Sequence, residues 1–332
     1  MSEYQSVDFE GGDQVGKGDA VRNLSLELAS QGLDVTVVSF PCYATPIGFA
    51  VRKVLKEDLL SKYDMGLKEA TTAKMALFSL NRLEVLNSIL SSEKSDIYLF
   101  DRGPFSNALT IAYAISTGLS PEYQEELASK ALSLDSYFRE SLGVDKCVVR
   151  LCNTGCTWSK QRSEEGDLHE SRDVQEISDS IYSIFAKMLG DSWIDIPSKN
   201  ENGWRERSDI TKESLEFVKK RHKISPVGDC KQPNYFPVAW TLKNLYRGSR
   251  ADQGALNSFM SSVGSNNKQS MYEISEILSN QVASSVKEIA WYNREIERSV
   301  REILDDIPEL LFLLEGMYGE DFVIKFLKSV EK

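Results

Sequence analysis

The feature that most constrains this chain is a glycine-rich loop at residues 9–19, which reads FEGGDQVGKGD. An apolar segment precedes the loop, and a run of helical periodicity and then a strand-like run at 35–38 follow it. Strand, loop, helix and strand in this order are the context that a phosphate-binding loop requires. Within Gly11-x-x-x-x-Gly16-Lys17, glycines let backbone N–H groups turn toward phosphate oxygens, and the lysine reaches the terminal phosphates.

The position after Lys17 departs from the usual loop. Gly18 stands where a Ser or Thr hydroxyl normally binds Mg²⁺, and Asp19 follows it. A carboxylate is a good Mg²⁺ ligand, so Asp19 is a candidate replacement for the missing hydroxyl. An acid in the first turn of a helix also complements the helix dipole without binding a metal. Both interpretations of Asp19 stay open.

Five strand-like runs alternate with helical runs as far as about Leu215. The expected strands are 6–10, 35–40, 96–101, 146–151 and 193–196, and the expected helices are 20–31, 45–60, 69–91, 107–116, 121–142 and 174–189. Short buried strands joined by helical crossovers predict an α/β fold, a three-layer sandwich with a parallel five-stranded sheet between helices. Ligands bind at the carboxyl ends of such strands, so the residues there are candidates for function.

The chain has 332 residues, which favours two domains over one. Residues 221–236 contain prolines, a glycine and polar residues, and they are expected to link a domain at 1–220 to an all-α domain at 237–332. Apolar residues recur at helical spacing along 270–306, and such a stripe needs a partner helix, either within the domain or across a dimer. The role of the helical domain is not indicated.

Composition argues against several classes of function. The net charge of -11 disfavours a protein that holds nucleic acid mainly through a basic surface. The five cysteines are an odd number without paired spacing and predict reduced thiols. Cys152 and Cys156 with His169 miss the usual zinc spacings. Because the N-terminus lacks the regions of a signal peptide and no apolar run approaches a membrane span, no membrane partner is expected and the expected location is the cytoplasm.

Two pairs of residues are candidates for ligand binding. Phe78 and Arg82 are four apart in an expected helix and therefore share one face. An aromatic plane beside a guanidinium suits a nucleobase, although a buried Phe beside a surface Arg is the commoner arrangement. Asp101 and Arg102 end the third strand, where they either face a metal and a phosphate or form a salt bridge at the sheet edge.

Two further segments carry candidate residues. Phe40 and Pro41 open the connection after the second strand, with Thr45 as the expected cap of the next helix. Residues 158–173 form a polar, charge-rich stretch that includes Arg162. This stretch is either a flap whose arginines close over phosphates or a solvated loop.

Taken together, these segments resemble thymidylate kinase, a P-loop nucleoside monophosphate kinase that phosphorylates thymidine monophosphate with ATP. The residues that carry the resemblance stand in the family's order and are Phe9, Glu10, Gly11, Asp13, Gly16, Lys17, Phe40, Pro41, Thr45, Gly48, Leu77, Phe78, Asn81, Arg82, Asp101, Arg102, Ser106, Arg162, Asp167 and Glu170. The resemblance covers about residues 1–215 and does not extend into the C-terminal third.

The resemblance implies a role for each matching side chain. Lys17 would hold the donor phosphates, Asp13 would accept the sugar 3′-hydroxyl, and Phe78 would stack on the thymine. Arg82 would bind the base or its phosphate, and Arg102 the acceptor phosphate. The implied catalytic residues are Lys17, Asp101, Arg102 and, from the lid, Arg162. The residues expected to bind the ATP phosphates are Gly11, Gly12, Asp13, Gln14, Val15, Gly16, Lys17, Gly18 and Asp19. The residues expected to bind the monophosphate are Asp13, Phe40, Pro41, Phe78, Arg82 and Arg102. The candidate Mg²⁺ ligands are Asp19 and Asp101.

The chain departs from the family at several positions besides Gly18. Tyr43 stands where many relatives have an arginine, Gly103 where an aromatic residue is usual, and Thr110 and Ile111 where many relatives carry Tyr and Gln. The function that the resemblance implies is ATP-dependent phosphorylation of a deoxynucleoside monophosphate, foremost dTMP to dTDP, by a homodimer that uses Mg²⁺. Two alternatives stay open: a kinase-like nucleotide-binding or regulatory protein that has lost catalysis, and a deoxynucleoside kinase.

Overall fold

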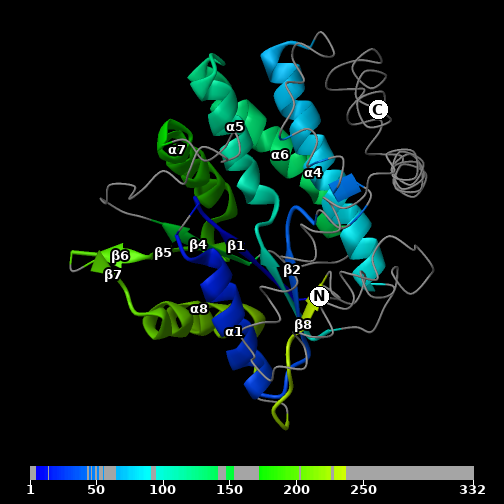
Figure 1. Cartoon of the computed structure of the whole chain (residues 1–332), viewed down its shortest axis with the longest axis vertical. Coiled ribbons are helices and arrows are strands. Elements are labelled where there is room, and N and C mark those ends of the chain that lie inside the picture. Colours follow the sequence, from blue (N-terminus) through cyan, green and yellow to red (C-terminus); the bar gives the residue numbers. More distant parts are fainter. Residues whose placement is uncertain are drawn as a thin grey trace, which may run out of the picture.

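The computed structural model describes residues 5–13, 15–42, 45, 47, 48, 51, 55, 65–90, 95–140, 147–152, 172–201, 203–225 and 228–236. Its centre is a 6-stranded sheet in the order β5-β4-β1-β3-β2-β8, in which neighbouring strands are parallel (Figure 1). The strands are β1 (Gln5–Glu10), β2 (Val35–Ser39), β3 (Ile97–Asp101), β4 (Val148–Cys152), β5 (Trp193–Pro197) and β8 (Asn234–Phe236). A short antiparallel pair follows β5 and consists of β6 (Lys199–Asn200) and β7 (Gly203–Trp204).

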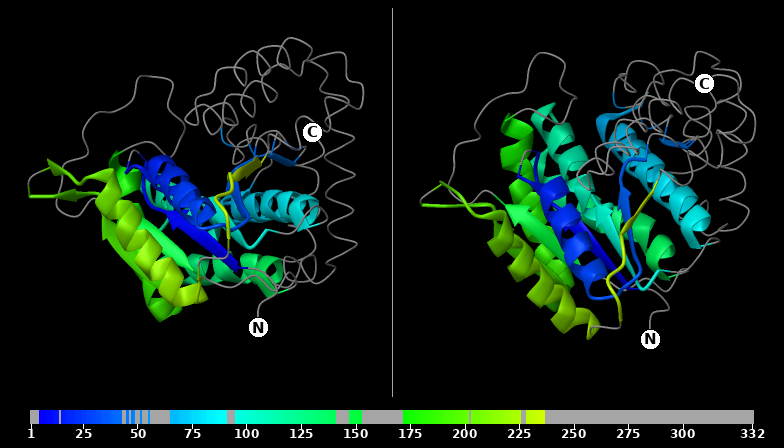
Figure 2. Two further views of the ribbon diagram at one scale, coloured as in Figure 1. Left: turned by 90° about the horizontal axis from the view of Figure 1, so that it is seen from below. Right: turned by 60° about the horizontal axis from the view of Figure 1, so that its bottom comes forward.

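Helices cover both faces of the sheet, as Figures 1 and 2 show. They are α1 (Lys17–Ser30), α4 (Leu67–Leu90), α5 (Asn107–Ser116), α6 (Gln124–Glu140), α7 (Arg172–Leu189) and α8 (Arg207–His222). The helices α1 and α8 enclose one hydrophobic core against the sheet, and α4 to α7 enclose a second core on the other face. The expected α/β three-layer sandwich is therefore confirmed.

The central strand β1 shows how the two layers differ. Val7 and Phe9 belong to the core beneath α1 and α8. Asp8 and Glu10 alternate with them and therefore point to the face that α4 to α7 cover. Both carboxyl side chains are fully buried, which is uncommon because burying a charge is costly unless hydrogen bonds or counter-charges compensate it. The strand thus carries two acidic groups into the centre of the fold, directly before the glycine-rich loop.

The five expected strands are confirmed, with ends that differ by one or two residues. The helix α1 begins at Lys17, earlier than expected, because the end of the loop forms its first turn. The helix expected at 121–142 is divided into a 3-10 turn at Pro121–Tyr123 and α6. The helix α8 was missed, because two of its four buried residues are polar and the apolar stripe is correspondingly weak.

The strand β8 extends the sheet beyond the five expected strands. Thr36 pairs with Asn234 and Val38 with Phe236. These residues fall in the segment expected to be a linker, so the chain returns to the sheet before the expected helical domain begins. A strand of 3 residues is too short to show a periodic signal, which explains why sequence reasoning missed it.

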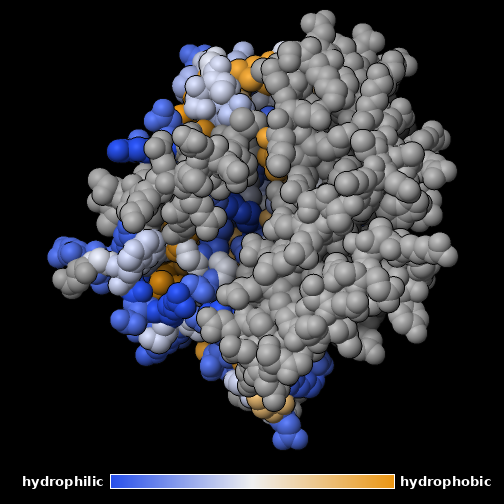
Figure 3. Space-filling model, viewed as in Figure 1, coloured by the Kyte–Doolittle hydropathy of each residue, from blue (hydrophilic) through white to orange (hydrophobic). Residues whose placement is uncertain are grey.

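Several predictions fall outside the described residues. They are the helical domain at 237–332, almost all of the flap at 158–173, and most of the helix expected at 45–60. Where the surface is described, it is largely hydrophilic in the view of Figure 3, and its exposed large apolar side chains are Tyr123, Met188 and Trp204. Within the same described part, no helix is both long and apolar enough to cross a membrane.

A buried ion pair joins α4 to α6, on the face of the sheet that α4 to α7 cover. Arg82 donates from Nε and Nη2 to the two carboxylate oxygens of Asp135, each over 2.9 Å, and Nη2 also donates to Ser79 Oγ over 3.1 Å. The two charged side chains are only 4% and 2% exposed. A pair of this kind tolerates poorly the loss of one partner, because the other charge then stays buried without compensation.

We expect Asp135→Ala to lower the free energy of unfolding by about 3 to 5 kcal/mol, because it leaves the Arg82 guanidinium buried without its carboxylate. Urea denaturation of both chains measures the difference. The matched control is Glu126→Ala on the same helix, where the exposed carboxylate pairs with Lys68 and Lys130 and the expected loss is below about 1 kcal/mol. Equal losses in the two variants would contradict a structural role for the buried pair.

Candidate functional site

The glycine-rich loop leads from β1 into α1 by a path that requires glycine. Gly11 has φ +130°, and a Cβ built on it would lie 2.1 Å from the carbonyl oxygen of Leu151. Gly16, with φ 90°, is the left-handed residue that caps α1. Since the free N–H groups at the start of a helix attract anions, this path suits the phosphate site that the sequence predicts.

The lysine of the loop is buried against the loop itself. Lys17 Nζ donates a hydrogen bond to the carbonyl oxygen of Gly12. Burial first and the positive charge of Arg102 second lower the pKa of Lys17 to about 8, against the carboxylates of Asp13, Asp101 and Glu10, which raise it. The Lys17 ammonium group is buried and its pKa is lowered, so a phosphate oxygen in place of the Gly12 carbonyl oxygen would stabilise its positive charge.

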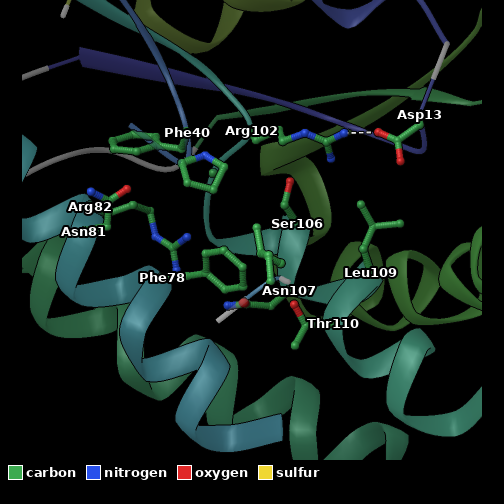
Figure 4. Close-up of a pocket in the computed structure, with 13 residues that line it drawn as sticks. Asp13, Phe40, Phe78, Asn81, Arg82, Arg102, Ser106, Asn107, Leu109 and Thr110 are labelled. Carbon is green, nitrogen blue, oxygen red and sulfur yellow. Dashed lines mark hydrogen bonds and ion pairs between the residues drawn. The ribbon is translucent and has the colours of Figure 1, made fainter. Parts of the chain in front are cut away.

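An ion pair connects the loop to the turn after β3. Arg102 Nη2 contacts Asp13 Oδ1 (Figure 4). Burial alone would lower the pKa of Arg102, but Asp13 foremost, with Tyr182, Asp101 and Glu10, raises it above its ordinary value, so the guanidinium stays charged. The loop and the end of β3 are therefore joined by Asp13 and Arg102. The resemblance implied different contacts for these two side chains, the sugar 3′-hydroxyl for Asp13 and the acceptor phosphate for Arg102.

Gln175, in the first turn of α7, completes the surroundings of Asp13. Its Oε1 accepts the backbone N–H of Asp13 over 2.9 Å, and its Nε2 donates to Asp13 Oδ2 over 3.0 Å. Arg102 and Gln175 thus hold the two carboxylate oxygens of Asp13 from different elements. Sequence reasoning missed Gln175, since only the tertiary structure brings α7 to the loop.

A pocket of about 90 Å³ lies between the end of β3, α4 and α5 (Figure 4). Its walls are formed by Asp13, Phe40, Pro41, Leu55, Phe78, Asn81, Arg82, Arg102, Gly103, Ser106, Asn107, Leu109 and Thr110. All six residues expected to bind a monophosphate line this one pocket, although they come from four separate segments of the chain. We call it the acceptor-side pocket, after the monophosphate that these residues are expected to bind.

Arg82 reaches the pocket with most of its hydrogen-bonding capacity already used. The pair with Asp135 occupies Nε and Nη2, which leaves Nη1 as the nitrogen outside that pair.

The neighbouring Asn81 connects the residues after β2 to α4, because its Oδ1 accepts the N–H of Cys42 over 2.9 Å and its Nδ2 donates to Thr45 Oγ1 over 2.9 Å. The wall formed by Phe40 and α4 is therefore built largely by internal hydrogen bonds.

Asn107 is a pocket residue that sequence reasoning missed. It is only 2% exposed, and within the described part of the chain its Nδ2 has no hydrogen-bond partner. A buried amide donor without a partner is costly, and a ligand oxygen in the pocket would satisfy it. The signal in the sequence was its place at the start of a helix, a few residues after Arg102.

The two candidate metal ligands lie in different surroundings. Asp101 is buried at the end of β3, and its charge acts on both Lys17 and Arg102. Asp19 instead places its carboxylate oxygens 2.9 Å from Arg207 Nη2 and 3.3 Å from Arg22 Nη2. Among the described residues no cluster of three or more acidic, His or Cys side chains could enclose a metal. Mg²⁺ at phosphates needs only one or two carboxylates, so Asp101 fits this need, whereas Asp19 is engaged by arginines.

A second cavity of about 370 Å³ lies along the outer side of α1. Its walls are formed by Val15, Gly16, Asp19, Ala20, Asn23, Trp204, Arg205, Arg207 and Ile210. Trp204 is 56% exposed, and Lys199 Nζ lies 4.3 Å from the centroid of its ring. This cavity begins at Gly16, where the loop ends, and the ring of Trp204 gives it an aromatic wall.

Three residues named in the sequence analysis, Gln14, Tyr43 and Arg162, lie outside the described residues.

Glu10 is the buried acid next to both the loop and the pocket. Burial first and the charge of Asp8 second raise its pKa to about 7, against the hydrogen bonds from Ser106 and Gly103 and the charge of Arg102. Asp8 also accounts for Gly103, because a Cβ on that glycine would lie 2.6 Å from Asp8 Oδ1. A larger residue at position 103 would therefore collide with this buried acid.

The sheet, the loop and the acceptor-side pocket define a P-loop α/β fold. No family model matches the chain, and no curated protein matches it. Among solved structures, the chain is similar to thymidylate kinase from Candida albicans, with 18% identity, a match over 69% of this chain and 97% of that one, and a TM-score of 0.45. It is also similar to thymidylate kinase from Ehrlichia chaffeensis, with 18% identity, 66% and 99% of the two chains matched, and a TM-score of 0.39. At these values we draw no functional conclusion from the likenesses and use the residues of the chain itself.

The pKa of Glu10 predicts a pH-dependent stability. The pKa of the Glu10 carboxyl group rises from 4.5 to about 7 on folding, so the folded state binds more protons than the unfolded state between these pH values. The contribution of Glu10 to the free energy of unfolding is therefore complete below pH 4.5 and is lost as pH rises through 7. The loss amounts to about 3 kcal/mol. Relative to the wild type, Glu10→Gln should therefore gain about this much in the free energy of unfolding over that range.

Urea denaturation at a series of pH values tests this expectation. The titratable groups that act with Glu10 are Asp8 and Arg102, together with Lys17 and the neutral phenol of Tyr182. The control is Val218→Ala in the opposite core, which should lower the whole pH curve without changing its shape. Parallel curves for the wild type and Glu10→Gln would contradict a raised pKa at Glu10.

Proposed function

We propose that this chain is a nucleoside monophosphate kinase, which transfers the terminal phosphoryl group of ATP to a deoxynucleoside monophosphate, foremost dTMP. The observation that carries the proposal is that Asp13 belongs to the phosphate-binding loop and also lines the acceptor-side pocket. A donor at the loop and an acceptor in the pocket would therefore lie beside each other. Phosphoryl transfer requires this proximity above all, because positioning and charge neutralisation supply most of the catalysis.

On the donor side, the N-terminus of α1 and Lys17 would bind the ATP phosphates. The second cavity begins at Gly16, and the base and sugar of the donor would lie there, with the ring of Trp204 as an aromatic surface for the base. Mg²⁺ held at Asp101 would neutralise negative charge on the transferred group. The residues of the chain would fix the donor and exclude water around its phosphates.

On the acceptor side, Arg102 would leave Asp13 and bind the acceptor phosphate, while Asp13 would accept the sugar 3′-hydroxyl. In the absence of a ligand the two groups satisfy each other, and their separation would enlarge a pocket that is smaller than most ligand sites. Phe40, Pro41 and Phe78 would enclose the base between apolar surfaces. The amide of Asn107 would donate to a carbonyl oxygen of the base, which thymine offers and adenine lacks.

One observation favours a second candidate, a protein that binds nucleotides without turnover. Gly18 lacks the hydroxyl that usually binds Mg²⁺, and the arginine contacts of Asp19 compete with any replacement role. A deoxynucleoside kinase remains the third candidate. Turnover and binding therefore have to be measured separately.

A coupled assay that follows ATP consumption, with each of the four deoxynucleoside monophosphates and with thymidine as acceptor, tests the proposal. We expect turnover foremost with dTMP, and a loss of about 10² to 10³-fold in kcat/KM for ATP in Lys17→Ala, because a buried phosphate-binding charge is removed. The surface variant Lys68→Ala is the control and should keep the wild-type rate. Calorimetric binding of ATP and dTMP without turnover would favour the second candidate.

The role of Asn107 predicts a change confined to the acceptor. Asn107→Ala should raise KM for dTMP about tenfold, because the ligand loses a buried hydrogen bond, and should leave KM for ATP within about twofold. Asn107→Asp keeps the shape but replaces the donor by an acceptor, so its effect should be at least as large. Steady-state kinetics with each substrate varied in turn measures both values, and an equal rise in the two KM values would contradict the assignment.

A further inference from the structure

Glu10 makes its hydrogen bonds to the turn that follows β3. Its Oε1 accepts the backbone N–H of Gly103 over 2.8 Å, and its Oε2 accepts the hydroxyl of Ser106 over 2.5 Å. Gly103 precedes the 3-10 turn at Pro104–Ser106, which leads directly into α5. One side chain at the end of β1 therefore holds the segment that carries the pocket residues of α5.

The same turn contains a backbone conformation that needs support. Arg102 has φ 68°, in the left-handed region that is unfavourable for a residue with a Cβ. Its own N–H donates to the carbonyl oxygen of Phe9 over 3.0 Å, and the next N–H along the chain is the one that Glu10 accepts. Consecutive residues of β1 thus hold the peptide groups on both sides of Arg102.

Glu10 itself does not line the acceptor-side pocket, whereas the residues that it holds do. Arg102, Gly103 and Ser106 form part of the pocket wall, and Glu10 lies behind that wall, fully buried. We propose that Glu10 is a positioning residue for the acceptor, which directs the Arg102 guanidinium and the Ser106 hydroxyl at the acceptor phosphate and sugar through the turn at Gly103. This inference rests on the proposed function and adds to it a residue whose role neither the loop pattern nor the pocket lining indicates.

The hydrogen bonds predict an order among variants. Glu10→Ala removes both acceptors, so the turn at Arg102 keeps only its bond to the carbonyl oxygen of Phe9. Glu10→Gln keeps one oxygen for the Gly103 N–H, and its amide can donate to Ser106 Oγ, which is able to accept. We expect KM for dTMP to rise at least about tenfold in Glu10→Ala and by less in Glu10→Gln, while KM for ATP changes by less than about twofold in both.

Hydrogen–deuterium exchange provides a readout that does not depend on activity. The Gly103 amide should exchange faster in Glu10→Ala, and peptides covering residues 102–107 should report this change. The control is Val218→Ala, a destabilising change in the core beneath α1 and α8. It should leave exchange at 102–107 and the ratio of the two KM values as in the wild type.

The outcomes separate this inference from the proposed function. A wild-type chain that neither binds nor phosphorylates dTMP would refute the proposed function, and the acceptor role of Glu10 with it. A wild-type chain that phosphorylates dTMP, with Glu10→Ala showing unchanged exchange at 102–107 or equal changes in both KM values, would refute the positioning role alone. Faster exchange together with a selective rise in KM for dTMP, partly restored in Glu10→Gln, would support it.

Discussion

The ion pair between Asp13 and Arg102 is the contact on which the arrangement of this site depends. It joins the loop after β1 to the turn after β3, two neighbouring strands whose carboxyl ends open at the same edge of the sheet. Gln175 brings α7 to the same carboxylate. Because each partner holds the other in a partly buried position, the charges stay compensated until a ligand with complementary groups replaces them.

The site concentrates charge that the fold would otherwise avoid burying. Glu10 and Asp101 are buried and act on Lys17 and Arg102, and the buried Asp8 acts on Glu10. The pKa values of Glu10 and Lys17 shift toward the neutral forms because burial is the largest influence on each. An anionic phosphate would reverse this tendency for the lysine, since it supplies a counter-charge where water is largely excluded. A phosphate bound here would therefore change the stability of the fold through the same few side chains.

Much of the architecture was predictable because its signals are local. Buried parallel strands are short apolar runs, and all five expected strands of this kind are confirmed. The glycine-rich loop was readable because Gly11 and Gly16 hold backbone conformations that a side chain opposes. The helix α8 and the strand β8 escaped prediction for the opposite reason: α8 buries polar residues among its apolar ones, and β8 is stabilised by pairing with β2 and not by its own pattern.

The residue types of the site follow from the chain alone: a lysine after glycines, a carboxylate and a guanidinium at a strand end, and an aromatic residue one helical turn from an arginine. Which groups these side chains contact was decided only by tertiary packing. Arg82 turns to Asp135, Asp19 turns to Arg207, and Asp13 turns to Arg102. The strength of a charge interaction depends on the distance between the groups and on their burial, and both are set by elements far apart in the sequence. For that reason Glu10, Asn107 and Gln175 became candidates for function only once the sheet had brought their neighbours together.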